Sequence, residues 1–274
     1  MTLFEMIKQY DLSGQIEVLK NSYKQAEYSW HQPVDLSSVK TDKIKNIIVT
    51  GLGGSTIGGE LISNFLKDEL KVPYLVNRNY ELPQFTDENT IVIASSYSGN
   101  TEETIAALKE AVSRKAQAVC LTTGGEVEKI CQKEGIPFLR LQSGFQPRYA
   151  LCGNFFALLK IIENLKLVPS QEKTVLSIIE LLKSRGDEFS KENNKALEIA
   201  EALNGFLPVI YAVSDFTSAA GTRFKGQINE NSKLHASCNM FPEMNHNEII
   251  GWETVNEKQI KCKAVFIYND SYKS

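Results

Sequence analysis

The sequence predicts an α/β fold built on doubly wound parallel sheets, and two features of its pattern support this expectation. Short apolar strands alternate with helices from residue 45 to residue 140. This alternation implies right-handed crossovers and a parallel sheet with helices on both faces. A second strand–helix set begins at residue 207, so we expect two α/β domains in tandem.

The first domain is expected to span residues 45–160, with an N-terminal helical segment, 1–44, packed on it. Apolar residues at helical spacing occupy positions 3 to 30, and Gly14 divides them into two short helices. The expected strands are 45–50, 72–76, 90–94, 116–121 and 136–140, and the expected helices are 57–66, 101–113 and 127–133.

The second domain is expected to span residues 161–274. Residues 150 to 203 carry helical patterns with breaks at Pro169-Ser170 and near Asn193-Asn194. The strand 207–213 and the helix 217–231 follow, and the strands 234–239 and 261–267 complete the set. The domain therefore repeats the α/β plan of the first one but stops after few strands.

Composition and charge exclude several classes of protein. The formal net charge of −3 comes from scattered charges, which argues against a nucleic-acid partner or a membrane surface. No apolar run approaches the roughly 20 residues that span a bilayer, and the N-terminus is not typical of a signal peptide. Five widely spaced cysteines without a CxxC motif indicate free thiols and a cytoplasmic protein. Three histidines without a paired ligand motif argue against a metal site.

A hydroxyl-rich stretch, SSYSGNTEE at 95–103, follows a buried strand and leads into a helix. Three serines and one threonine lie in it, and Gly99 allows a tight turn. The first N–H groups of a helix lack internal partners and carry partial positive charge, so such a turn can bind an anion. Any single serine here could instead be an ordinary helix cap. Together the residues predict a phosphate site.

A glycine-rich turn, GLGGST at 51–56, lies between another predicted strand and helix. The third glycine of a GxGxxG motif is missing, and no acidic residue follows the strand 72–76, so a dinucleotide site is the weaker interpretation. Ligands of parallel sheets bind at the carboxyl ends of the strands. Both turns are expected at that edge, and their coincidence is more specific than either turn alone.

Five stretches together resemble one family. SYSGNTEET resembles the phosphate loop of the SIS (sugar isomerase) domain, and GLGGST resembles that domain's first glycine loop. The stretches QPR at 146–148, NENSK at 229–233 and NHNEIIGW at 245–252 resemble the bifunctional phosphoglucose/phosphomannose isomerases. This resemblance implies two tandem flavodoxin-like SIS domains, no cofactor, a homodimer with a shared active site, and interconversion of glucose 6-phosphate or mannose 6-phosphate with fructose 6-phosphate.

The resemblance also assigns binding roles to the residues that match the motifs. Gly53, Gly54 and Ser55 would line the sugar, and Arg148 would stabilise the negative charge of an enediol intermediate. From the residues alone, Arg148 is a loop cation that could be a surface charge or a helix partner. The phosphate would be bound by Ser96, Ser98, Gly99, Asn100 and Thr101.

Two further residues would act on protons. Glu230 shares a helix face with Arg223 and Gln227, which without the resemblance is a solvated polar face. The resemblance makes Glu230 the base that moves a proton between C2 and C1, a task that suits a partly buried carboxylate of raised pKa.

His246 is expected in the first turn of a helix capped by a box of Asn245 and Glu248. From the residues alone, this histidine could be a surface residue near a cap. The resemblance makes His246 the group that opens the sugar ring, contributed by the neighbouring subunit. His235 alternates with apolar residues in an extended segment and is expected to be structural.

The C-terminus departs from the resembling branch, whose members continue past the strand that matches 261–267. The continuation carries a lysine used in ring opening and a threonine linked to the acceptance of both epimers. Neither position exists here, so we expect a truncated or naturally short second domain. Two alternatives remain open: a sugar-phosphate-binding module or regulator without turnover, and an SIS isomerase for another sugar phosphate.

Overall fold

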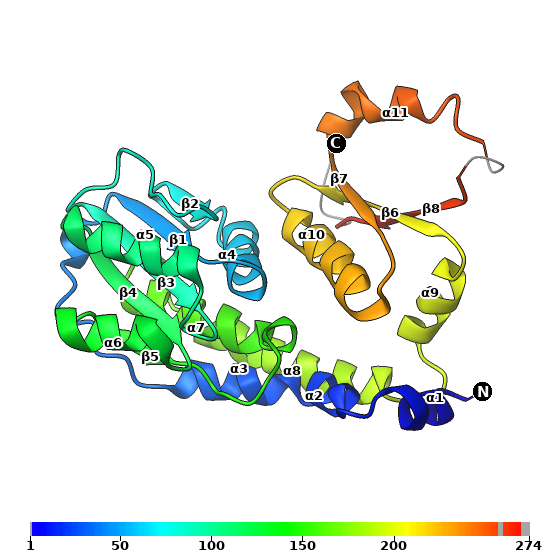
Figure 1. Cartoon of the computed structure of the whole chain (residues 1–274), viewed down its shortest axis with the longest axis horizontal. Helices are drawn as coiled ribbons and strands as arrows, with labels where there is room; N and C mark the ends of the chain where they lie inside the picture. The colour runs from blue at the N-terminus through cyan, green and yellow to red at the C-terminus, as the bar shows by residue number, and fades with distance from the viewer. Residues whose placement is uncertain (1, 257–259, 270–274) are drawn as a thin grey trace. The chain divides into compact units, whose positions relative to one another are not determined.

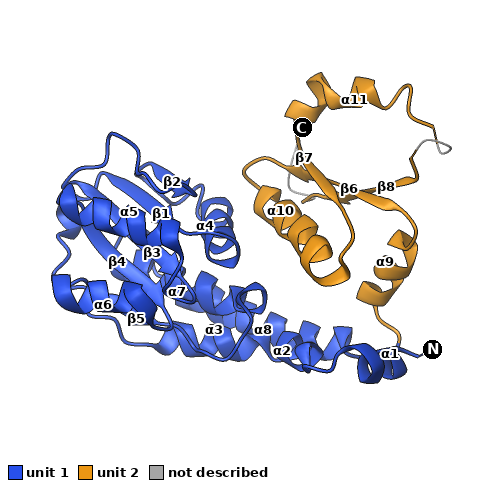
Figure 2. Cartoon of the chain, viewed as in Figure 1, with its two compact units in different colours: residues 1–192 blue, residues 193–274 orange. Residues whose placement is uncertain are grey.

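The computed structural model describes residues 2–256 and 260–269 (Figure 1). Contacts divide the chain into two compact units, residues 1–192 and 193–274 (Figure 2). We expected the second domain to begin at residue 161, whereas the second unit begins at Asn193. The helix α8 (Glu172–Phe189) accounts for the difference, because its buried Val175 and Ile179 belong to the core of the first unit.

The first unit is built on a five-stranded sheet in the order β2-β1-β3-β4-β5, with every pair parallel. The central strand β3 is buried along its whole length, as expected for a sheet covered on both faces. The strands are β1 (Asn46–Thr50), β2 (Tyr74–Asn77), β3 (Thr90–Ser96), β4 (Gln117–Thr122) and β5 (Phe138–Arg140).

Helices cover both faces of this sheet (Figure 1). Ile47 and Val49 of β1 point to the face covered by α4 (Gly54–Phe65) and α7 (Leu151–Asn164). Ile48 points to the opposite face, which α5 (Glu102–Ser113) and α6 (Gly125–Glu134) cover. The doubly wound parallel sheet predicted from the sequence is therefore confirmed.

The N-terminal segment forms three helices where two were expected: α1 (Leu3–Tyr10), α2 (Gln15–Lys20) and α3 (Ser22–His31). Gly14 separates the first two, in the left-handed conformation with φ of 65°. α3 contributes to the core of the first unit, because its Ala26 and Trp30 side chains are buried in that core.

The second unit has a three-stranded parallel sheet in the order β7-β6-β8. One face packs on α10 (Ser218–Gln227), and the other carries a short 3₁₀ turn (Glu243–His246) and α11 (Glu248–Gly251). The strands are β6 (Leu207–Val213), β7 (Ser237–Phe241) and β8 (Cys262–Ile267), and α9 (Lys195–Leu203) precedes them. No helix in the described part of the chain is long and apolar enough to cross a membrane.

Candidate functional site

The serine loop, which we define as residues 95–101, joins β3 to α5 and has an inner and an outer side. Ser96 is buried, its Oγ lies 2.9 Å from Oγ1 of Thr101, and it accepts a hydrogen bond from the Gly99 N–H at 3.1 Å. Ser98 and Asn100 are exposed, and Thr101 is half-buried. Ser96 therefore shapes the loop from inside, while the other three residues line its open side.

The loop between β4 and α6 braces the serine loop. The Val127 N–H donates to the Gly99 carbonyl at 3.0 Å, and the Glu126 N–H donates to Oδ1 of Asn100 at 3.1 Å. Gly99 has φ of 70°, and a Cβ there would lie 1.8 Å from the Gly124 carbonyl oxygen. Only glycine fits at position 99, because a side chain would collide with the backbone of the brace.

The N-terminus of α5 directly follows the serine loop. Thr101 occupies the cap position, but its side chain makes no capping bond to the helix. The first-turn N–H groups of a helix have no partner within it, so they can bind an anion. Two acids, Glu102 and Glu103, share this turn, and the charge of Glu103 raises the pKa of the nearby Tyr80 phenol.

The glycine loop, residues 51–56, lies directly against the serine loop. A Cβ on Gly51 would approach the Ser95 carbonyl oxygen to 2.6 Å. Ser55 is 8% exposed, and its Oγ accepts a hydrogen bond from the Tyr97 N–H at 3.3 Å. The two turns predicted at one edge of the sheet are therefore in contact.

Arg148 lies in a 3₁₀ turn (Pro147–Tyr149) that also packs against the glycine loop. A Cβ on Gly54 would lie 2.7 Å from the Pro147 carbonyl oxygen. The Arg148 side chain is half-buried, its Nε is inaccessible to solvent, and its guanidinium carbon lies 5.3 Å from the centre of the Tyr149 ring. The first unit thus brings together the serine loop, the glycine loop and the Arg148 turn.

Glu230 belongs to the second unit and is exposed there. The expected continuous helix 217–231 ends at Gln227 and is followed by a π turn, Ile228–Ser232, which contains Glu230. Lys233, with φ of 57°, terminates this turn, and its ammonium group donates to the Glu230 carbonyl. The partial burial expected for the Glu230 carboxylate is absent within this chain.

His246 does not lie in the first turn of a helix, so that prediction was wrong. It is the last residue of the 3₁₀ turn that begins at Glu243, and Asn247 caps α11 instead, with its side chain accepting from the Glu248 N–H at 2.6 Å. The expected capping box fails because the Glu248 carboxylate bonds to Tyr211 and Asn239 rather than to the backbone of Asn245. His246 and His235 are both exposed.

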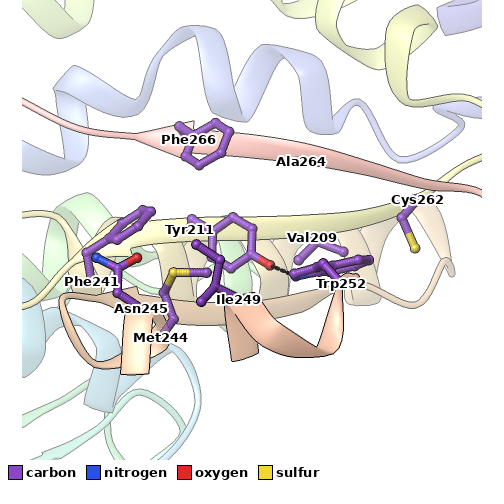
Figure 3. A pocket seen from close by; sticks show the side chains of 10 residues that line it. All are labelled: Val209, Tyr211, Phe241, Met244, Asn245, Ile249, Trp252, Cys262, Ala264 and Phe266. Atoms are coloured by element: carbon purple, nitrogen blue, oxygen red, sulfur yellow. Dashed lines mark hydrogen bonds between the residues drawn. The ribbon is translucent and has the colours of Figure 1, made fainter. Parts of the chain in front are cut away.

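A polar cluster anchors the segment that carries His246. The Tyr211 hydroxyl donates to the Glu248 carboxylate at 2.6 Å. It accepts from the Trp252 indole N–H at 2.7 Å (Figure 3). Burial, followed by the bond to Glu248, raises the pKa of Tyr211 to about 12. The same bond lowers the pKa of Glu248. An apolar cavity of about 390 Å³ lies over this cluster, lined by side chains such as Phe241 and Ile249.

Comparison with known proteins places these features in a family. Residues 42–130 match the SIS domain, and residues 192–274 match the bacterial phospho-glucose isomerase C-terminal SIS domain. A bifunctional phosphoglucose/phosphomannose isomerase of Thermoplasma volcanium is 34% identical over 85% of this chain and 72% of its own length. The chain belongs to the SIS family of phosphoglucose/phosphomannose isomerases.

Further relatives of this SIS protein show how far the likeness extends. The bifunctional phosphoglucose/phosphomannose isomerase of Caldicellulosiruptor bescii is 42% identical over 79% of this chain, which covers 65% of that relative. A D-glucosamine-6-phosphate 4-epimerase of Sulfolobus acidocaldarius is 34% identical over 78% of this chain and 66% of its own length. This chain thus spans about two thirds of the length of these relatives.

Solved structures support the SIS fold. The C-terminal domain of a glucosamine-fructose-6-phosphate aminotransferase from Francisella tularensis superposes with a TM-score of 0.67 at 16% identity. The alignment covers 94% of this chain and 74% of that domain, so the likeness concerns the fold alone.

Sequence analysis missed several residues that hold the predicted site residues in place within their own units. Gly124 and Gly125 both have positive φ and contact the serine loop, and the GG pair in TTGGE was a usable local signal for them. Gln25, Tyr97 and Tyr211 had no such signal, since their partners lie far away in the sequence.

Proposed function

We propose that this protein is an aldose–ketose isomerase that interconverts glucose 6-phosphate or mannose 6-phosphate with fructose 6-phosphate. The family relationship supports this reaction class. The observation that carries the proposal is the meeting of the serine loop, the glycine loop and the Arg148 turn at one edge of the five-stranded sheet. At that edge the serine loop offers a site for an anion, and the glycine loop offers a surface that a sugar can approach closely. The Arg148 side chain adds a cation.

The phosphate of the substrate would bind on the open side of the serine loop. Ser98 and Thr101 offer hydroxyl groups, Asn100 offers an amide, and the α5 N-terminus offers backbone N–H groups. Ser96 and Gly99 maintain the shape of the loop from inside. The sugar would then extend over the glycine loop at Gly53, Gly54 and Ser55.

The reaction would pass through a cis-enediol. His246 of a second subunit would assist ring opening by transferring a proton to the ring oxygen as the C1–O5 bond breaks and the anomeric hydroxyl loses its proton. Glu230 would remove the C2 proton of the open aldose and return it at C1, while the hydroxyl proton passes from O2 to O1, giving the ketose without net gain or loss of protons. Arg148 would stabilise the negative charge that develops on the enediol oxygens, where a fixed cation is most effective.

The exposure of Glu230 and His246 in the single chain suits a site completed by a second subunit. We therefore include a homodimer in the proposal, to be tested by light scattering coupled to gel filtration. We also propose a cytoplasmic location, which the five free cysteines of the chain support.

Turnover is the direct test. Purified protein is incubated with fructose 6-phosphate, and glucose 6-phosphate is measured by a coupled dehydrogenase, with mannose 6-phosphate and glucosamine 6-phosphate assayed in parallel. We expect Glu230→Gln to lower kcat by at least about 10³-fold, as expected for removal of a catalytic base. Glu201→Gln, at an exposed position of α9, is the matched control and should retain wild-type kcat.

Binding separates the isomerase from its alternatives. Fructose 6-phosphate should bind in calorimetry, and Thr101→Ala should weaken it, whereas Ser113→Ala at the other end of α5 should not. Tight binding with no turnover would favour a binding module or regulator. Turnover of glucosamine 6-phosphate alone would favour a different sugar-phosphate enzyme.

A further inference from the structure

The backbone that follows Arg148 is held by a side chain from the N-terminal segment. Gln25 of α3 is 2% exposed and lies more than a hundred residues away in sequence. Its amide nitrogen donates to the Tyr149 carbonyl at 2.9 Å, and its amide oxygen accepts from the Gly153 N–H at 3.3 Å. One buried amide therefore fixes the exit of the Arg148 turn and the first turn of α7.

The backbone that precedes Arg148 is held by a side chain of the serine loop itself. The Tyr97 hydroxyl donates to the Gln142 carbonyl at 3.0 Å and accepts from the Phe145 N–H at 2.9 Å. Burial raises the pKa of Tyr97, so the phenol stays protonated and keeps its donor. The irregular segment between β5 and the Arg148 turn is thereby fastened to the predicted phosphate site.

Packing leaves little freedom at this junction. A cavity of only about 10 Å³ lies among Gln25, Tyr97, Phe145 and Gly153, which is room for one water molecule at most. Asn154, one residue further along α7, donates from its amide to Oγ of Ser95 at 2.6 Å. The loop before the turn and the helix after it are therefore both tied to the strand and loop that would bind phosphate.

We propose that Gln25 and Tyr97 are positioning residues that set the place of the Arg148 guanidinium relative to the serine loop. A long flexible side chain can meet developing charge only if its backbone is fixed, and these two residues fix it on both sides. The catalytic consequence rests on the proposed isomerase function. It also gives the N-terminal helical segment a part in catalysis, because α3 supplies Gln25.

The kinetic test removes the hydrogen bonds while keeping the bulk of the side chains. We expect Tyr97→Phe and Gln25→Leu each to lower kcat about tenfold or more, with KM for fructose 6-phosphate changed less than about twofold, because misplacing a catalytic group raises the barrier more than it weakens ground-state binding.

The matched controls are Tyr74→Phe and Gln171→Leu. Tyr74→Phe removes a part-buried phenol bond to a backbone carbonyl, that of Gly59, at 2.8 Å. Gln171→Leu removes the amide bonds from Gln171 to the Glu69 carboxylate at 2.6 Å and to the Pro169 carbonyl at 3.2 Å. Both controls lie in the first unit. They should lower the melting temperature by a similar amount and leave kcat unchanged. Wild-type kcat in Gln25→Leu and Tyr97→Phe, or an equal loss in the controls, would overturn the proposal.

A double-mutant cycle tests whether the effect passes through Arg148. In an Arg148→Ala background, Gln25→Leu should cause no further loss of kcat, since the group being positioned is already gone. A full additional loss in that background would mean that Gln25 acts elsewhere.

An NMR measurement tests the positioning role of Gln25 and Tyr97 independently of the proposed isomerase reaction. The Arg148 Nε lies out of solvent contact, so its Hε should exchange slowly and give a distinct NMR signal. We expect Gln25→Leu and Tyr97→Phe to speed that exchange about tenfold or more and the two controls to leave it unchanged. If the wild-type protein turns over no sugar phosphate, the exchange rate of the Arg148 Hε still tests the positioning role. Unchanged exchange in Gln25→Leu and Tyr97→Phe would refute that role.

Discussion

A single methyl group at position 54 should test whether the Arg148 turn must lie where the structure places it. The new Cβ of Gly54→Ala would lie 2.7 Å from the Pro147 carbonyl oxygen, whereas ordinary contact begins at 3.4 Å. The turn must therefore retreat by about 0.7 Å, the difference between these distances. Pro147 directly precedes Arg148, so the guanidinium moves with it. A displacement approaching 1 Å can cost up to about 100-fold in rate, and we expect a 10- to 100-fold loss of kcat, about 1.4–2.7 kcal/mol.

The assay is fructose 6-phosphate turnover with calorimetric binding of the same ligand. Binding should fall less than kcat, because the serine loop that would bind the phosphate is untouched and only the sugar-lining residue Gly54 is changed. Gly226→Ala is the control: this glycine lies in α10, a Cβ there has nothing within 4 Å, and its φ is not positive. It should keep full activity and raise stability by up to about 1 kcal/mol through helix propensity. A Gly54→Ala protein with wild-type kcat would refute the reasoning about the turn.

Three further outcomes are expected. Gly99→Ala should weaken fructose 6-phosphate binding at least about tenfold in calorimetry, because its Cβ would lie 1.8 Å from the opposing carbonyl of the β4–α6 loop; unchanged affinity would count against the serine loop as the phosphate site. Glu248 has a lowered pKa in the folded protein, so its stabilising effect is fully present above its ordinary pKa of 4.5 and is lost as the pH falls below 4.5 through the lowered pKa of the folded state. The melting temperature of the wild type should accordingly fall more on acidification than that of Glu248→Gln, and parallel curves would contradict this. Tyr211→Phe removes the acceptor of the Trp252 indole N–H and should shift tryptophan emission in a Trp30→Phe background, where an unchanged spectrum would argue against the cluster.

Secondary structure was largely predictable because the local patterns were strong. The strand 207–213 was predicted with the bounds that the structure gives, and the break at Pro169-Ser170 separates α7 from α8 as expected. The errors occur where a distant partner overrides a local signal. Asn245 and Glu248 have the spacing of a capping box, but Tyr211 and Asn239 bind the Glu248 carboxylate and the box does not form.

The candidate site likewise contains parts that local sequence predicted and parts that depend on distant partners. The serine loop and the glycine loop each combine strand, small residues and helix within a few positions, so local chemistry identified both. The residues that join them to Arg148 could not be found in this way. Gln25 contacts Tyr149 from the N-terminal segment. Tyr97, which follows β3, contacts Gln142, which follows β5.

The sequence alone determined the order of strands and helices, the two turns at the carboxyl edge of the sheet, and the family to which their motifs belong. Those properties depend on periodicity and on residue types that lie next to one another. Only the tertiary structure decided that Ser96 lies inside its loop, that Gly54 supports the Arg148 turn, and that α3 helps to hold that turn in place. Each of these depends on the approach of atoms far apart in the chain, which a local pattern does not encode.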